Sequence, residues 1–101
     1  MKIGTMEIEG KAVLAPMAGV TDRPFRKLCR HFGAAYCVTE MVSAKALQFK
    51  DKKTPLLMRL DQDEHPAAIQ LFGSEPDVMA MAAEKAMAFS PDAIDINMGC
   101  P

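Results

Sequence analysis

The sequence predicts an α/β protein built on a parallel sheet, and three observations support this fold class. Apolar runs at 12–15, 68–72 and 93–96 are too short for helices and are typical of strands buried on both faces. Segments with helical periodicity separate these runs, and the connections are short. Glycine, proline and capping residues mark the junctions. Strands that alternate with helices in this way predict right-handed crossovers between parallel neighbours.

The chain begins with residues that predict a hairpin and then the first buried strand. Apolar and polar residues alternate over 3–8, which is typical of a short antiparallel hairpin that ends near Gly10. Residues 12–15 form the first buried strand. Pro16 ends it, because proline has no N–H to donate to a neighbouring strand.

A helix is predicted between this strand and Gly33. Thr21 or Asp22 can cap its start, and Pro24 is tolerated in the first turn. Gly33 is well placed to end it, since glycine readily adopts the left-handed backbone that follows a helix. Four apolar residues spaced at i, i+3, i+4 and i+7 predict its buried face: Phe25, Leu28, Cys29 and Phe32.

The same signals recur through the middle of the chain. Residues 35–39 are compatible with a strand. Ser43 is placed to cap a short helix that runs through Phe49. After a polar loop, residues 56–60 suggest one further segment.

The last third repeats the pattern of strand, helix and strand. The strand at 68–72 ends at Gly73, and residues 74–77 resemble a capping box. The helix that follows runs to about Phe89, and the strand at 93–96 ends the pattern. The predicted order is therefore a hairpin followed by β, α, β, α, β, α and β.

Composition is typical of an ordinary globular protein rather than a disordered or fibrous one. The 101 residues are 50% hydrophobic and 25% charged, with a formal net charge of −1. Such a charge gives no overall attraction to nucleic acid, so RNA contact would need a local patch. No apolar run approaches the roughly 20 residues of a membrane helix, and the first ten residues lack the apolar core of a signal peptide. We therefore expect a cytoplasmic protein without membrane contact.

The cysteines and the short motifs exclude several classes of site. Cys29, Cys37 and Cys100 are an odd number without a close C-x-x-C pair, which argues against a disulfide framework and a zinc site. We expect no metal. The chain also lacks GxGxxG, Walker, HExxH and Ser–His–Asp signatures. Without a phosphate-binding motif, a doubly wound nucleotide-binding sheet is less favoured than a barrel.

Ligands of parallel α/β proteins bind at the carboxyl ends of the strands, and unusual residues lie at three of these ends. They are the small and kinked residues 15–19 where the first strand ends, Gln70 within an apolar strand, and Asp95, Asn97 and Cys100 on the last strand and just after it. Asp95 lies between two isoleucines, and either a supporting role beside the site or an ion pair inside a barrel would account for it. Glu40, at the end of the second predicted strand, receives no role.

Four blocks of residues carry a resemblance to a known family. LAPMAGVTDRPFR at 14–26, VTEMVSA at 38–44, QLFGS at 70–74 and DINMGCP at 95–101 follow one another in this order and spacing. Together they resemble the tRNA-dihydrouridine synthases, and the bacterial B-type members most. The likeness covers nearly the whole chain. It implies a TIM (β/α)8 barrel, of which residues 1–101 would form the N-terminal portion: the hairpin and about four strands. The rest of the barrel and a helical tRNA-binding domain would lie outside these residues.

The resemblance also implies an activity and a set of site residues. Such an enzyme binds FMN, which NADPH reduces, and converts specific uridines of tRNA to 5,6-dihydrouridine. The FMN contacts fall on Pro16, Met17, Ala18 and Gln70, the proton donor on Cys100, and a uracil contact on Asn97.

The residue types suit these roles. A glutamine or asparagine amide offers a donor and an acceptor side by side, which matches the edge of a flavin pyrimidine or a uracil. Thiols have an ordinary pKa of about 8.5, so most are protonated near neutral pH and can act as general acids. The target uridine must leave its stack to reach such a site.

Two other interpretations stay open from the sequence. A related FMN barrel could act on a free pyrimidine, in the manner of dihydroorotate or dihydropyrimidine dehydrogenases. Alternatively, residues 1–101 could be a non-catalytic half-barrel that binds a partner or self-assembles. The 101-residue chain alone would then be inactive.

Two further expectations concern surfaces. Arg23, Arg26, Lys27 and Arg30 recur at helical spacing, and we favour a solvated outer face over contact with tRNA phosphates. A parallel sheet that stops after four strands leaves apolar edges bare. We therefore expect the isolated chain to be poorly soluble or partly unfolded, and a sharp cooperative melt of a purified monomer would contradict this.

Overall fold

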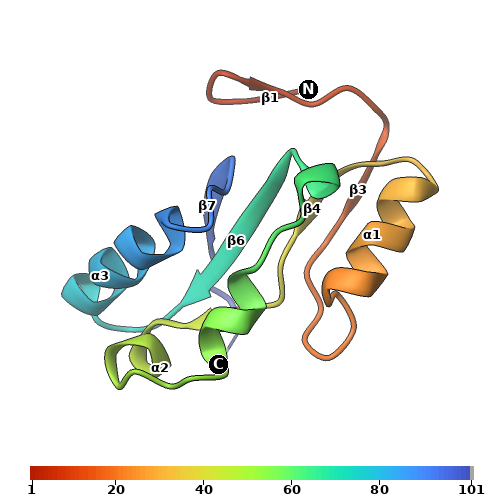
Figure 1. Ribbon diagram of the computed structural model, residues 1–101. Helices are drawn as coiled ribbons and strands as arrows, with labels where there is room; N and C mark the ends of the chain where they lie inside the picture. Colours follow the sequence, from red (N-terminus) through yellow and green to blue (C-terminus); the bar gives the residue numbers. More distant parts are fainter. Residues whose placement is uncertain (101) are drawn as a thin grey trace.

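The computed structural model describes residues 1–100 and has the α/β fold with a parallel sheet that the sequence predicts. The strands are β1 Lys2–Ile3, β2 Met6–Glu7, β3 Ala12–Leu14, β4 Ala34–Val38, β5 Val42–Ser43, β6 Ala67–Phe72 and β7 Ala93–Ile96. The helices are α1 Arg23–His31, α2 Ala44–Gln48 and α3 Pro76–Met87, with 3-10 turns η1 Thr54–Met58 and η2 Gln62–Glu64. Figure 1 shows their arrangement.

In the main sheet the strands lie side by side in the order in which they occur along the chain, when the short strand β5 is counted together with β4. β4 and β5 both pair with the edge of β6 opposite to β7. The register changes from Val38 opposite Ala68 to Val42 opposite Leu71, so the β4–β5 side holds one extra residue. β5 is therefore the continuation of β4 after a bulge, and the order is β3, β4 with β5, β6 and β7. This order is consistent with the first strands of a barrel; the barrel itself stays a prediction.

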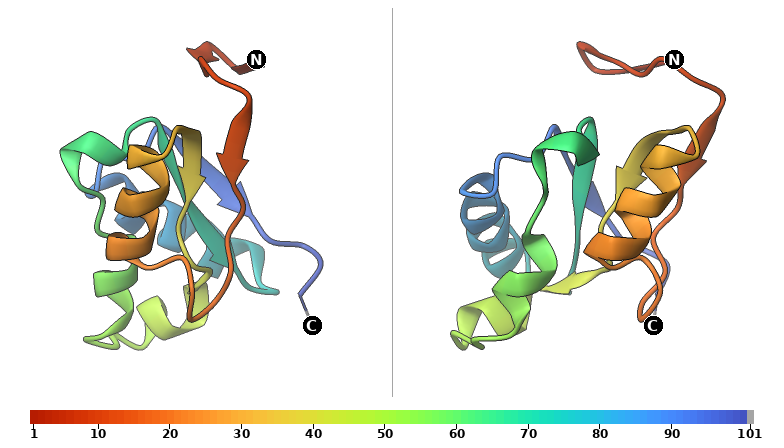
Figure 2. Two further views of the ribbon diagram at one scale, coloured as in Figure 1. Left: turned by 90° about the vertical axis from the view of Figure 1, so that its right-hand side faces the viewer. Right: turned by 45° about the vertical axis from the view of Figure 1, so that its right-hand side comes forward.

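Alternate residues of the central strand β6 face two different cores. Ile69 and Leu71 pack with the helices α2 and α3. Ala68 faces the other side, where it packs with Ile8 and Tyr36. Figure 2 shows the predicted hairpin β1–β2 at one end of the sheet. The carboxyl ends of β6 and β7 lie at the opposite end. The hairpin thereby closes the amino-terminal end of the second core.

Two of the predicted helix starts are confirmed, and one is wrong. The Asp22 side chain accepts from the Phe25 N–H at 3.0 Å at the start of α1. Ser43 caps α2 by accepting from Ala46 at 3.1 Å. The predicted capping box at 74–77 does not form, because the N-cap of α3 is Glu75 without a side-chain bond. The start lies one residue later than the motif requires, which moves its acidic residue out of position.

The predicted buried face of α1 is also wrong. Phe32 is 81% exposed, Leu28 is 52% exposed and Phe25 lies at the surface, whereas Cys29 is half-buried. Arg26 and Arg30, predicted to belong to a solvated stripe, make the contacts instead, whereas Lys27 is exposed as predicted. Arg30 donates to the carbonyls of Ala34 and His65 at 2.6 Å each.

Arg26 is the centre of this contact and is 1% exposed. Its Nε donates to Glu64, which is fully buried, at 2.5 Å. Its two terminal nitrogens donate to the carbonyls of Thr21 at 2.8 Å and Arg59 at 2.9 Å. The acidic segment 61–64 therefore determines which face of α1 points inward. The periodicity of the helix alone could not reveal this, because the partners come from elsewhere in the chain.

None of the helices in residues 1–100 combines the length and the apolar character that a membrane crossing requires.

The Arg26–Glu64 pair yields a stability prediction. Arg26→Met removes the cation and leaves the buried Glu64 carboxylate with only the Asp61 N–H as a partner, so we expect the free energy of unfolding to fall by about 3–5 kcal/mol. The matched control is Lys27→Met, whose pair with Asp63 spans 3.6 Å between side chains that are 59% and 60% exposed. We expect less than about 1 kcal/mol there.

Urea denaturation measures the loss in free energy of unfolding for both variants. The measurement uses the longest form of the protein that unfolds cooperatively. Equal losses for the two variants would show that the buried pair does not hold α1 in place.

Candidate functional site

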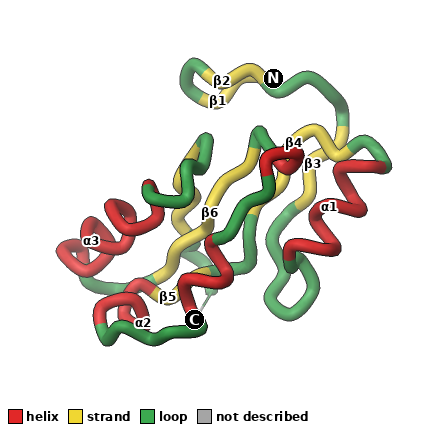
Figure 3. Tube along the Cα trace, viewed as in Figure 1, coloured by secondary structure: helices red, strands yellow, loops and turns green. Residues whose placement is uncertain are grey.

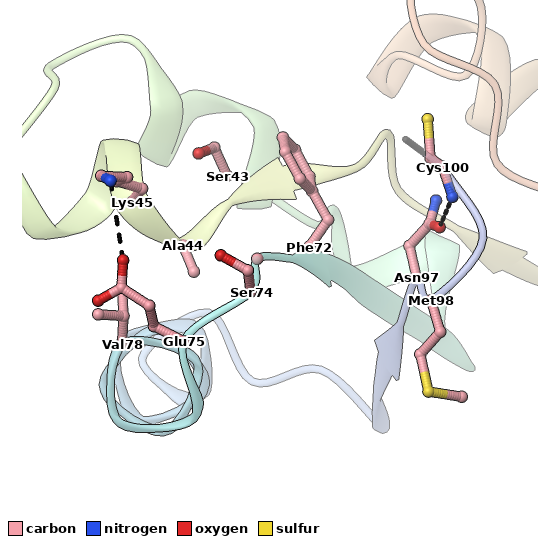
Figure 4. Close-up of a pocket in the computed structure, with 11 residues that line it drawn as sticks. Ser43, Ala44, Lys45, Phe72, Ser74, Glu75, Val78, Asn97, Met98 and Cys100 are labelled. Atoms are coloured by element: carbon pink, nitrogen blue, oxygen red, sulfur yellow. Dashed lines mark hydrogen bonds and ion pairs between the residues drawn. The ribbon is translucent and has the colours of Figure 1, made fainter.

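A cavity of about 420 Å³ lies where the strands of the sheet end. Phe72 at the end of β6, Ser43 at the end of β5, and Asn97 and Cys100 after β7 contribute to its wall. Figure 4 shows these side chains together with Ser74 and the exposed pair Lys45–Glu75 on the opposite wall. The predicted proton donor and the predicted uracil contact thus share one cavity.

A chain of hydrogen bonds joins the polar residues of β6 and β7. Gln70 lies opposite Asp95 in the register, and its Nε2 donates to Asp95 Oδ2 at 2.5 Å. Asn97 Nδ2 donates to Gln70 Oε1 at 3.3 Å. Asn97 Oδ1 accepts from the backbone N–H groups of Gly99 at 3.0 Å and Cys100 at 2.9 Å. Three residues that the sequence singled out are therefore brought together: Gln70, Asn97 and Cys100.

The loop after β3 is built separately from this chain of bonds. Thr21, which is buried, accepts from the Met17 N–H at 3.0 Å and donates to the Met17 carbonyl at 3.2 Å. Glu40 accepts from the Gly19 N–H and so ties the loop to the end of β4. Gly19 has a φ of +74°, which favours glycine in this tight turn.

The predicted cofactor loop lies at the same end of the sheet as the segment that follows β7, as Figure 3 shows. Met17 and Ala18 are exposed and Pro16 is half-buried. None of the three lines the cavity that holds Cys100. Gln70 does not line this cavity either, but hydrogen bonds join it to Asn97 and the Cys100 turn, whereas Pro16, Met17 and Ala18 belong to the separate loop after β3.

Sequence reasoning did not assign the supporting residues Thr21, Glu40 and Asp95. Asp95 carried one signal, a carboxylate between two isoleucines in a buried strand. Within residues 1–100, Asp95 bonds to an amide and takes part in no salt bridge, which agrees with a supporting role beside the site. Glu40 and Thr21 lacked any such pattern, because their partners are backbone groups.

The ionisable groups near the sheet differ in their surroundings. Burial raises the pKa of the Tyr36 phenol, and the negative charges of Asp95 and Asp92 raise that pKa further. Burial also raises the pKa of the Cys37 thiol, which is fully enclosed. Cys100, in contrast, is exposed and free. Of the three thiols, Cys100 is therefore the most accessible to a ligand.

Across residues 1–100, no three His, Cys, Asp or Glu side chains gather in a way that could hold a metal ion.

Comparison with known proteins agrees with the four sequence blocks. The family model described as dihydrouridine synthase matches residues 13–101. The chain belongs to the dihydrouridine synthase family.

Several curated relatives are similar over the whole chain. The tRNA-dihydrouridine synthases B of Pseudomonas aeruginosa and Vibrio vulnificus are 42% and 44% identical to it over 101 residues. A probable tRNA-dihydrouridine synthase 1 of Synechocystis is 42% identical over 102 residues. The chain spans 30%, 31% and 28% of these proteins, respectively, and so corresponds to less than a third of their length.

The loop after β3 provides a local prediction. Thr21→Val keeps the side-chain shape but removes the hydroxyl that accepts from Met17. Losing one such bond costs about 1 kcal/mol, so we expect the Met17 amide hydrogen to exchange with solvent roughly fivefold faster. Thr5→Val, in the exposed turn of the hairpin, is the control. Unchanged exchange at Met17 would show that Thr21 does not hold the loop.

Proposed function

We propose that this chain forms the first part of a flavin-dependent tRNA-dihydrouridine synthase, a TIM barrel that reduces specific uridines of tRNA to 5,6-dihydrouridine. Its site would use Cys100 as the proton donor, Asn97 as a uracil contact, and Gln70 with residues 16–18 as FMN contacts. The observation that carries the proposal is the chain of hydrogen bonds that links the backbone N–H of Cys100 to Asn97 and Gln70 and leaves the Cys100 thiol exposed, in a chain of this family.

The residues at the site suit a flavin. Gln70 is 7% exposed, and its amide uses only one donor hydrogen and one acceptor lone pair within the protein. One donor hydrogen and one acceptor lone pair remain, and the pyrimidine edge of an isoalloxazine offers the complementary groups. Exposed Met17 and Met98 offer apolar surface for a flat ring nearby. When bound, and after reduction by NADPH, FMN would supply the hydride that reaches C6 of the uracil.

Cys100 and Asn97 supply the other half of the reaction. Reduction of the C5=C6 bond needs a proton at C5 as well as the hydride at C6, and the Cys100 thiol donates it and then regains a proton from solvent. Asn97 has its oxygen bound to the turn, and beside Gln70 its Nδ2 meets only Met41 Sδ, a weak acceptor at 3.9 Å, so one hydrogen can turn to a carbonyl of the base. The cavity that both residues line is large enough for a single unstacked base.

The complete enzyme would require segments beyond these 101 residues, since the similar proteins are about three times as long. Those segments would supply the rest of the barrel, and a separate domain would contribute most of the tRNA contact. A cytoplasmic location follows from a tRNA substrate and stays a prediction.

The central prediction concerns Cys100. In the complete protein, Cys100→Ala should leave FMN bound and reducible by NADPH, while dihydrouridine formation falls by about 100-fold or more, because the general acid is lost. Flavin absorbance follows the first two properties, and mass spectrometry of the tRNA follows the third. Cys29→Ala is the matched control, since Cys29 lies on α1 away from the cavity.

Normal turnover in the Cys100 variant would refute the proton-donor role. Reduction of free uracil or uridine by the wild-type protein, at a rate equal to that on tRNA, would instead assign the chain to an enzyme of free pyrimidines.

A further inference from the structure

Asp95 is the one carboxylate of β7 that points towards the candidate site. Its strand neighbour Ile94 packs with the helices on the opposite face of the sheet. Asp95 itself is half-buried and accepts from Gln70 Nε2 at 2.5 Å. Its negative charge is also felt by Tyr36 on the same face. The proposed reaction gives this residue no task, although a partly buried charge must be balanced by strong hydrogen bonds.

The two ends of the hydrogen-bond chain impose the same direction on both amides between them. An ionised carboxylate can only accept, so Asp95 requires the Nε2 side of Gln70. Backbone N–H groups can only donate, so Gly99 and Cys100 require the oxygen of Asn97. These two requirements are compatible, because Asn97 Nδ2 then meets Gln70 Oε1.

Rotation of either amide by half a turn would break the chain. A rotated Gln70 would present its oxygen to the Asp95 carboxylate and its N–H groups to Asn97 Nδ2, so both contacts would become repulsive. If Asn97 rotated in response, the N–H groups of Gly99 and Cys100 would lose their acceptor. Bonds to a charged acceptor are roughly twice as strong as neutral ones, and neighbouring bonds polarise each other.

We propose that Asp95 is a positioning residue that fixes, through Gln70 and Asn97, the turn that carries Cys100. The same carboxylate sets which side of the Gln70 amide donates to a ligand and which side accepts. The inference rests on the proposed function only in treating Gln70, Asn97 and Cys100 as the reacting centre. The hydrogen-bond chain itself belongs to the protein alone.

The direct readout is hydrogen exchange of the Cys100 amide, the last group in the chain. The complete protein is labelled with [15N]cysteine and studied by NMR without flavin or tRNA. Cys29 in α1 and Cys37 in β4 then serve as internal references in the same spectrum. Asp95→Asn keeps the shape but removes the charge and permits a rotated Gln70, so we expect the Cys100 amide to exchange about tenfold faster, with both references unchanged.

Two further variants separate positioning from general destabilisation. Asp92→Asn is the matched control, because Asp92 precedes the same strand and accepts from Ala67 and His65 at the opposite end. It should not change exchange at Cys100. Gln70→Met removes the intermediate amide, so it should match the effect of Asp95→Asn, and the double variant should add nothing further.

The Cys100 amide could stay fully protected from exchange in Asp95→Asn, or Asp92→Asn could accelerate its exchange equally. The effects of Asp95→Asn and Gln70→Met could also add in the double variant. Each of these results would overturn the inference. So would a wild-type Cys100 amide that exchanges as fast as an unprotected one. A protein that binds no FMN and makes no dihydrouridine would refute the proposed function instead, and the exchange result would still decide the role of Asp95. With FMN bound, Asp95→Asn should also weaken flavin affinity about tenfold.

Discussion

The buried guanidinium of Arg26 is the constraint on which the arrangement of the N-terminal half depends. It connects three segments: the start of α1, the loop that leads from β3, and the acidic turn before β6. Its bond to the Thr21 carbonyl is important for the site, because the Thr21 hydroxyl holds Met17 on both sides. A single buried charge therefore extends its effect from the core to the loop after β3, which holds the predicted cofactor contacts. Such a charge is tolerated because Glu64 neutralises it and two carbonyls complete its hydrogen bonding.

The sequence predicted the elements better than it predicted their faces. The strands, the hairpin and the caps at Asp22 and Ser43 depend on residues within a few positions of one another, and these expectations are confirmed. The inward face of α1 was predicted wrongly, because apolar periodicity assumes that the nearest core is apolar. Here the segment that packs against the helix is acidic, and its identity depends on tertiary structure. The bulge between β4 and β5 was missed for the same reason, since only pairing with β6 defines it.

The residues of the candidate site likewise fall into a group that the sequence could predict and a group that it could not. Gln70, Asn97 and Cys100 could be proposed from their places at strand ends, because parallel strands bring their carboxyl ends to one edge of a sheet. The residues that hold them in place could not be proposed in this way. Asp95 meets Gln70 through cross-strand register, and Glu40 meets Gly19 through a loop, so neither contact follows from spacing along the chain. Sequence patterns reveal residues with unusual chemistry, whereas a supporting residue is recognised only by what it touches.

Register links the site to the stability of the sheet. In β6 and β7, Ile69, Leu71 and Ile94 face the helices, while Gln70 and Asp95 face the other side. A slip of one residue would turn a carboxylate and an amide into the apolar core and expose isoleucine in their place. The free energy of burying these apolar side chains, at about 25 cal/mol per Å², therefore also enforces the pairing of Gln70 with Asp95. The site inherits its geometry from the core, and a substitution that loosened the packing under α3 would disturb the Cys100 turn without touching it.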